Sequence, residues 1–199
     1  VITGEGRGFC AGQDLGDGGA NGARDIDLER TLAEEYEPLL QRIYDCPVPT
    51  ISAVHGFCIG GGIGIAGASD FVIASEDATF QLPEIDRGAL GAMTHLMRMV
   101  GVQKARRMLF TCEAISADEL YRLGGCESVV PREKLRDEVM SVARSIASKS
   151  PAALRLGKQA ANLTLVILPT NRAGLLPMLT EGRADLAAGT ITVTEGRRA

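Results

Sequence analysis

The hydrophobic and polar positions of the chain fall into two alternating patterns. Short apolar runs bounded by glycine, proline or aspartate are typical of buried strands, and they occur at residues 1–4, 50–54, 71–74, 79–81 and 129–131. Longer stretches with apolar residues every three or four positions are typical of helices, and they occur at 28–46, 63–69, 92–110, 117–123 and 132–162. Strands that alternate with helices predict an α/β fold.

Several local signals refine these elements. Residues 5–25 are rich in glycine and aspartate and predict a long loop, structured as far as residue 15. Asp27 suits the N-cap of the first helix, and Pro38 predicts a kink inside that helix. Pro151 predicts a break in the last helical stretch.

The tail of the chain lacks the pattern of the rest. An apolar run at 163–168 is followed by two prolines and scattered glycines, without the amphipathic helix expected there. We therefore expect a core domain at 1–131 and a C-terminal helical region at 132–199, with an atypical tail from about residue 163.

Composition and charge exclude several classes of protein. The 199 residues suit one domain, and 45% hydrophobic with 23% charged residues is ordinary for a globular protein. No run of eighteen or more apolar residues occurs, so we expect no membrane span. The net charge of −4 argues against a nucleic-acid partner, because such proteins carry a basic surface.

The cysteines and the start of the chain add two expectations. The five cysteines include no CxxC pair, so they predict neither a disulfide framework nor a metal site, and reduced thiols favour a cytoplasmic location. The chain opens on Val1 as if at the end of a strand, with no initiator methionine and no signal-peptide pattern. We therefore expect that the N-terminal part of the core is missing.

A glycine triplet is the first candidate for chemistry. Residues 56–62 predict a tight glycine turn between a strand and a helix. Free backbone N–H groups of the triplet 60–62 at the helix N-terminus could hold a phosphate or a developing oxyanion. A glycine cluster required only for packing remains an equal alternative. The spacing of Gly4, Gly6 and Gly8 is not G-x-G-x-x-G, and no Lys-Ser/Thr follows any glycine run, which argues against dinucleotide and Walker motifs.

Two segments together indicate a protein family far more specifically than the glycine triplet does alone. The segment GFCAGQDL at 8–15 precedes HGFCIGGG at 55–62 by about forty residues, and this pair resembles the enoyl-CoA hydratase/isomerase (crotonase) superfamily. Further family markers fall at Asp70, Phe80 and Pro83-Glu84. The resemblance implies a crotonase-like ββα spiral core, an acyl-CoA thioester substrate, no separate cofactor and a homotrimer or hexamer.

The resemblance also implies an oxyanion hole, in which two backbone N–H groups hold the thioester oxygen. One donor would be Gln13, just after the Ala-Gly of the first segment, and the other Gly61 in the glycine turn. Such a donor generally contributes about 10²–10³ in rate. The neighbouring positions implied to contact the substrate are Ala11, Gly12, Asp14, Leu15 and Gly60.

The acid/base positions depart from the pattern of the hydratases. Those enzymes commonly carry two glutamates, and here only Glu84 is present, because Gly64 stands at the other position. Glu84 is thus the expected general acid/base, against the alternative of a surface carboxylate that caps the turn before Gly88. A single carboxylate leaves water addition underpowered, since one group must both orient water and move the proton.

Three functions stay open at this point. The first is enolate chemistry of the hydratase or isomerase kind. The second is hydrolysis of a C–C bond in a ring β-diketone on a CoA thioester, which is implied because the segment 84–96 resembles crotonases of steroid-ring degradation. The third is a non-catalytic binding protein. His95 could join the site in the second case, although a structural role is the better expectation, and His55 is expected to hydrogen-bond the backbone.

Overall fold

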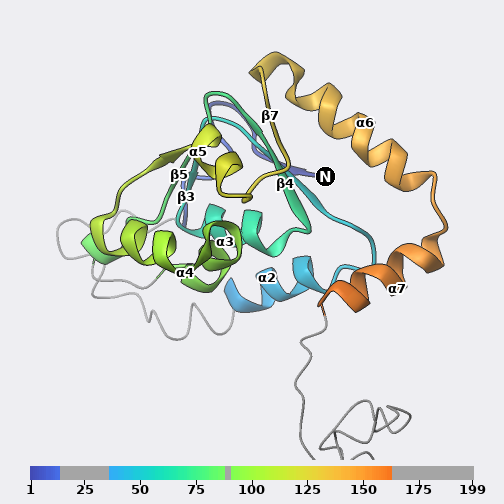
Figure 1. The fold of residues 1–199 in the computed structure, drawn as a ribbon, viewed down its shortest axis with the longest axis horizontal. Helices are drawn as coiled ribbons and strands as arrows, with labels where there is room; N and C mark the ends of the chain where they lie inside the picture. The colour runs from blue at the N-terminus through green and yellow to red at the C-terminus, as the bar shows by residue number, and fades with distance from the viewer. Residues whose placement is uncertain (14–35, 88–90, 163–199) are drawn as a thin grey trace, which may run out of the picture. The chain divides into compact units, whose positions relative to one another are not determined.

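The computed structural model describes residues 1–13, 36–87 and 91–162 (Figure 1). Val1–Ala161 form one compact unit, which contains every described residue except Asn162. The expected division at residue 131 stays a prediction, and the expected atypical tail lies outside the described residues. Within the described part of the chain, no helix is both long and apolar enough to cross a membrane.

A parallel sheet forms the centre of this unit. Its four strands are β1 (Ile2–Thr3), β2 (Ile51–Val54), β4 (Phe71–Ser75) and β7 (Ser128–Val130), in the order β1-β2-β4-β7. All three pairings are parallel, and β2 pairs with β4 over its whole length, from Ile51 opposite Phe71 to Val54 opposite Ala74. Because parallel strands need crossover connections, helices lie between them in the chain.

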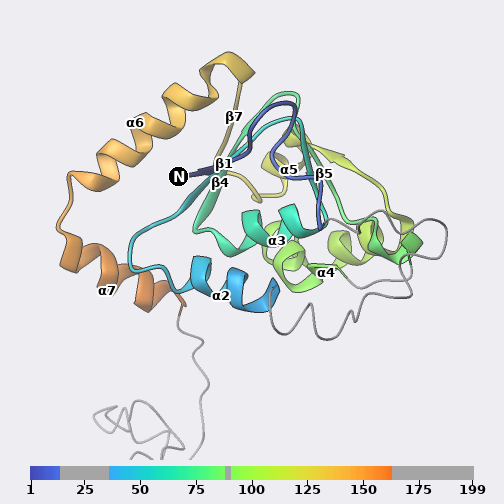
Figure 2. The same ribbon diagram turned by 180° about the vertical axis from the view of Figure 1, so that it is seen from behind.

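Both faces of this sheet are covered, because alternate side chains point to opposite sides. One face packs on α6 (Leu135–Ala147) through a core of Ile51, Ala53, Ile73, Leu135 and Val139. The other contributes Val54, Val72 and Ala74 to the larger core shared with α3 (Gly61–Ala68) and α4 (Met93–Thr111) (Figures 1 and 2). All of β2 is therefore buried instead of half-exposed, as is usual in parallel sheets.

A second sheet corrects one expectation from the sequence. Its strands are β3 (Phe57–Ile59), β5 (Thr79–Gln81) and β6 (Ile115–Ser116), with β3 and β5 parallel and β5 and β6 antiparallel. The segment 56–62 is thus not one continuous turn, because the fully buried Cys58 pairs with the fully buried Phe80 as a strand. Only Gly60 remains as the link between β3 and α3.

The helices follow the sequence pattern closely, with two differences. α2 (Glu37–Tyr44) begins one residue before Pro38, so this proline lies in the first turn and bends no described helix; Asp27 lies outside the described residues. The predicted helix at 92–110 is present as α4, but it is kinked at Gly101, where φ is +74°. α5 (Ala117–Arg122) and the break before α7 (Pro151–Asn162) are confirmed.

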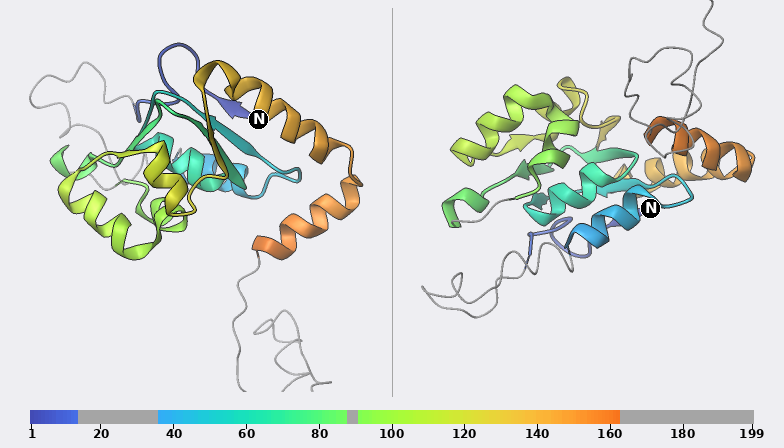
Figure 3. Two further views of the ribbon diagram at one scale, coloured as in Figure 1. Left: turned by 45° about the horizontal axis from the view of Figure 1, so that its top comes forward. Right: turned by 90° about the horizontal axis from the view of Figure 1, so that it is seen from below.

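α3 is the central helix of the unit. It contacts the strands β2, β3 and β4 on one side and packs against α2 and α4 on the other (Figure 3). Its sequence, GGIGIAGA, consists of small and aliphatic residues, and six of its eight positions are buried. A helix that is apolar on all sides belongs in a core, and this position aims its N-terminus at the loop that carries Gln13.

Candidate active site

The turn between β3 and α3 presents backbone N–H groups without a side-chain cap. Gly60 adopts φ +54° and ψ −113°, a conformation that strains other residues, and α3 starts at the next residue with no capping side chain. The first N–H groups of a helix have no partner within the helix. The partial positive charge at this helix N-terminus therefore favours negative charge on a group that lies beside the turn.

The first loop is held against this turn by backbone hydrogen bonds. Phe9 N donates to the His55 and Phe57 carbonyls at 2.9 and 3.0 Å, and Ile59 N donates to Cys10 O at 2.9 Å. These bonds continue the β3 sheet for one isolated bridge, between Cys10 and Cys58. The loop that carries the predicted donor Gln13 is thus fixed to β3 by its backbone.

The two predicted oxyanion donors lie next to each other. A β-carbon built on Gly61 would be 3.7 Å from Gln13 N, and one built on Gly12 would be 3.8 Å from Gly61 N. Gly12 has φ +98°, which lets the loop approach the turn so closely. Of the other predicted contacts, Ala11 is exposed beside this pair, whereas Asp14 and Leu15 lie outside the described residues.

Glu84 is the carboxylate at the turn. It opens the short 3-10 helix Glu84–Arg87, and its carboxyl group lies between two glycines, so that a β-carbon on Gly60 would be 2.6 Å from its Oε1 and one on Gly91 2.7 Å from its Oε2. Burial raises the pKa of this carboxyl above its ordinary value, although a backbone hydrogen bond acts in the other direction. Its Oε2 is buried and has no hydrogen-bond partner among the described residues.

Tyr36 is a site residue that the sequence did not identify. A β-carbon on Gly64 would overlap the Tyr36 hydroxyl, and one on Gly61 would be 3.4 Å from the ring. Tyr36 is one of the apolar positions of the predicted helix 28–46, where its ring fits the 3.6-residue period. The one feature of the sequence that could have identified Tyr36 is its hydroxyl group, because the other residues on that helix face are leucines and one isoleucine.

The histidines and cysteines have structural surroundings. His55 is buried, and its Nε2 lies 3.3 Å from Gly6 O, as expected. His95 packs against Gly67 at the far end of α3, and burial followed by the Arg98 charge lowers its pKa. Burial raises the pKa of Cys58 well above its ordinary value, which makes it a poor nucleophile. No group of three metal-binding side chains occurs in the described ranges.

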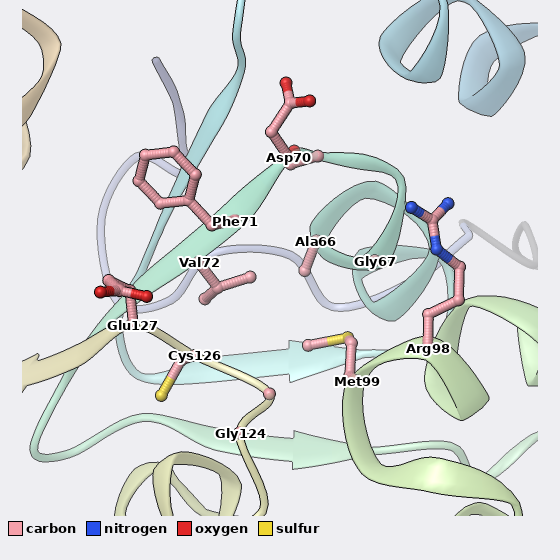
Figure 4. A pocket seen from close by; sticks show the side chains of 12 residues that line it. Ala66, Gly67, Asp70, Phe71, Val72, Arg98, Met99, Gly124, Cys126 and Glu127 are labelled. Atoms are coloured by element: carbon pink, nitrogen blue, oxygen red, sulfur yellow. The ribbon is translucent and has the colours of Figure 1, made fainter. Parts of the chain in front are cut away.

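A separate hollow of about 280 Å³ lies at the C-terminal end of α3 (Figure 4). Its walls come from α3, the start of β4, α4 and the segment 124–127, and Figure 4 shows Asp70, Arg98 and Glu127 around it. Neither Glu84 nor the Gln13–Gly61 pair lines this hollow. It is therefore distinct from the site at the N-terminal end of the same helix.

Comparisons with known proteins identify the family of this chain. Residues 1–175 match the family model for enoyl-CoA hydratase/isomerase. A (7aS)-7a-methyl-1,5-dioxo-2,3,5,6,7,7a-hexahydro-1H-indene-carboxyl-CoA hydrolase of Rhodococcus jostii is 44% identical over 165 residues, which cover 81% of this chain and 62% of that protein. A probable enoyl-CoA hydratase of Rhodobacter capsulatus is 46% identical, over 66% of this chain and 51% of that protein.

The fold is similar to that of a solved structure with a related name. The crystal structure of a probable enoyl-CoA hydratase from Mycobacterium smegmatis matches with a TM-score of 0.70 and 35% identity, over 79% of this chain and 63% of that one. The chain thus spans less than two thirds of the length of each of these relatives. The crotonase-like α/β core predicted from the sequence is confirmed, and the chain belongs to the enoyl-CoA hydratase/isomerase family, the crotonase superfamily.

Proposed function

We propose that this chain carries the enolate-stabilising site of an acyl-CoA enzyme, with Gln13 N and Gly61 N as the oxyanion hole and Glu84 as the acid/base. The observation that supports this most directly is the adjacency of these groups, since the Glu84 carboxyl lies against Gly60 and Gln13 N against Gly61. Donors fixed in place before the reaction stabilise developing negative charge without reorganisation. Ala11, Gly12, Asp14, Leu15 and Gly60 would line the path of the thioester.

Among the reactions of this family, we favour hydrolysis of a C–C bond in a β-dicarbonyl thioester. Tyr36 and Leu40 occupy the space over Gly64, so α3 carries no second carboxylate and has no room for one without displacing them. Hydration of a double bond would have to proceed with Glu84 alone. The Rhodococcus relative supports the choice, because its name describes a hydrolase of a dioxo CoA thioester.

One carboxylate is sufficient for both proton transfers of such a hydrolysis. Glu84 takes a proton from water as the water oxygen bonds to the ketone carbon. The C–C bond then breaks, and its electron pair becomes an enolate whose oxygen accepts the hydrogen bonds of Gln13 N and Gly61 N. Glu84 returns the proton to the enolate carbon, and the ketone carbon has become a carboxylic acid. Water is the only co-reactant, and no cofactor is needed.

The test is a comparison of two substrates with the purified protein. We expect ring-opened acid from a bicyclic β-diketone CoA thioester and little or no hydration of crotonyl-CoA. Rapid hydration of crotonyl-CoA without ring opening would support the hydratase alternative instead. Binding of both thioesters without turnover of either would support the non-catalytic alternative. Light scattering of the same sample tests the expected homotrimer or hexamer.

The pH dependence provides a further prediction. Glu84 acts as a base only when ionised, and burial raises its pKa. The acidic limb of kcat/KM should therefore lie above the ordinary glutamate pKa of about 4.3, with activity lost as the pH falls through that limb. A profile of kcat/KM from acidic to neutral pH measures it, and a limb at or below the ordinary value would contradict the assignment of the base.

Gly91 offers a test of how accurately the Glu84 carboxyl must be placed. A β-carbon on Gly91 would lie 2.5 Å from the carboxyl carbon, so Gly91→Ala must push the carboxyl away. A displacement of about 1 Å can cost about 10² in rate, so we expect a loss of that order in kcat. The carboxyl is the flexible end of a side chain, so the midpoint of thermal unfolding should change little.

The matched control is Gly157→Ala. Gly157 lies within α7, and a β-carbon there would meet no atom within 4 Å. We expect this variant to keep wild-type kcat and to gain about 0.5–1 kcal/mol in stability, since alanine favours a helix over glycine. Equal kcat in the Gly91 and Gly157 variants would show that the Glu84 position is not critical.

A further inference from the structure

The volume over Gly64 is filled by one aromatic side chain. The Tyr36 hydroxyl and ring stand where a Gly64 side chain would project, and Leu40 Cδ1 closes the same space at 2.9 Å from the β-carbon position. Tyr36 comes from the turn that leads into α2, and α2 packs along α3 (Figure 3). Glycine at position 64 and tyrosine at position 36 therefore depend on each other, because a side chain at position 64 would need the space that the tyrosine fills.

The hydroxyl group has a poor acceptor in this position. It lies 3.5 Å from Gly61 O, whereas O–H···O hydrogen bonds are usually near 2.7–2.8 Å. Burial, followed by the charge of Glu84 and the two nearby thiols, raises the pKa of Tyr36. The phenol consequently stays protonated at neutral pH and serves as a hydrogen-bond donor, not as a base.

Donor and acceptor lie beside the same turn. The Tyr36 ring is 3.4 Å from the β-carbon position of Gly61, and Glu84 Oε1 is 2.6 Å from that of Gly60. Glu84 Oε2 is buried without a partner in the described residues, so neither group is satisfied by the other. A ligand that reaches the turn would meet a donor with one long hydrogen bond, to Gly61 O at 3.5 Å, and an acceptor without a partner among the described residues.

We propose that Tyr36 is a further catalytic residue, whose hydroxyl donates a hydrogen bond to a second carbonyl oxygen of the acyl group and so selects dicarbonyl thioesters. This inference rests on the proposed function and specifies its substrate class. The thioester oxygen takes the Gln13 and Gly61 amides, and the ring ketone oxygen takes Tyr36. A substrate without the second carbonyl leaves the phenol with only its long hydrogen bond to Gly61 O, which disfavours that substrate.

The same hydrogen bond assists the chemical step. Water, deprotonated by Glu84, bonds to the ketone carbon, and the electron pair of the C=O bond moves to the ketone oxygen, where the Tyr36 hydroxyl stabilises it. The carbonyl re-forms as the C–C bond breaks, and the electron pair passes to the enolate held by the two amides. Tyr36 keeps its proton throughout, and Glu84 returns the water proton to carbon.

The test is Tyr36→Phe, which keeps the ring over Gly64 and removes only the hydroxyl. Two rates are compared: ring opening of the β-diketone thioester, and exchange of the α-proton of a saturated acyl-CoA, which needs the amides and Glu84 but no second carbonyl. We expect the ratio of ring opening to exchange to fall by about 10², the usual loss for one such donor. Tyr121→Phe, at an exposed tyrosine, is the matched control.

Two outcomes separate this inference from the proposed function. If the wild-type protein opens the ring and Tyr36→Phe keeps the wild-type ratio, the role of Tyr36 is refuted and the proposed function stands. If the wild-type protein exchanges the α-proton but opens no ring, the proposed hydrolysis fails, and this substrate class fails with it. Circular dichroism of the variant tests whether a lower ratio of ring opening to exchange reflects unfolding.

Discussion

Replacing Glu84 by glutamine should lower kcat/KM for the thioester substrate by about 10³, within the usual range of 10²–10⁴ for a general acid/base. Glutamine keeps the size and shape of the side chain, so its amide fits between Gly60 and Gly91 as the carboxyl does. It has no basic oxygen, so it takes no proton from water and returns none to carbon. The measurement is kcat/KM at the pH optimum, with substrate binding determined separately by calorimetry.

The same substitution should stabilise the protein at neutral pH. The folded-state pKa of Glu84 is raised by burial, so the folded protein holds this proton at pH values where the unfolded chain has lost it. The free energy of unfolding therefore falls as the pH rises from the unfolded pKa, about 4.3, through the folded value. Glu84→Gln removes this loss, so its melting temperature should exceed that of the wild type at pH 7, with a smaller difference in acid.

Asp86→Asn is the matched control, because Asp86 is an exposed carboxylate in the same 3-10 helix. It should keep most of the wild-type kcat/KM and show no stabilisation at neutral pH. If Glu84→Gln also kept wild-type turnover, Glu84 would not be the acid/base, and the proposed mechanism would fail. A large loss in both variants would mean that the 3-10 helix as a whole, not its first carboxyl, is needed.

The family resemblance was sufficient to predict that the two proposed oxyanion donors lie close together. Gln13 and Gly61 are 48 positions apart, and the resemblance of their two segments to one family implied that they meet. The glycines in both segments permit the close backbone approach. The structure places Gln13 N beside Gly61 and Glu84 beside Gly60. Their roles in the reaction stay predictions until the variants are measured.

The sequence was less informative where tertiary contacts decide the outcome. β3 is three residues long and lies within the glycine-rich segment, and its strand character comes from pairing with β5 and not from its own periodicity. Tyr36 matches the helix period as well as a leucine does, so its place over Gly64 could not be deduced from spacing. Both cases depend on residues that are distant along the chain.

Asp70 is another residue whose contact could not be predicted from the sequence. The sequence marks it as a family position, but its partner is Lys158, 88 positions away in a segment whose pattern predicts only a helix. The Asp70 Oδ2 atom accepts hydrogen bonds from Thr50 N at 2.6 Å, Thr50 Oγ1 at 2.9 Å and Lys158 Nζ at 2.8 Å. The pair joins α7 to the beginning of β4, next to the segment that precedes β2.

Breaking this ion pair is the second large effect that we expect. The Lys158 side chain is 6% exposed, and its other contacts among the described residues are long, to Val48 O at 3.3 Å and Ile43 O at 3.5 Å. Asp70→Asn leaves this ammonium group buried without a counter-charge, and the loss of one partner of a buried pair costs about 3–5 kcal/mol. We expect a loss near the middle of that range, measured as the free energy of unfolding in urea.

Lys158→Met should cost less, about 3 kcal/mol, at the lower end of the range for a broken buried pair. The Asp70 side chain is 24% exposed and keeps its two hydrogen bonds from Thr50, so its charge is less isolated than that of the lysine would be. The double variant should cost less than the sum of the two, because it leaves no unpaired charge.

Arg122→Met breaks an exposed pair with Glu119 and should cost less than about 1 kcal/mol. Equal costs for Asp70→Asn and Arg122→Met would show that burial adds nothing to the Asp70–Lys158 pair, and α7 would then be held by its apolar contacts alone.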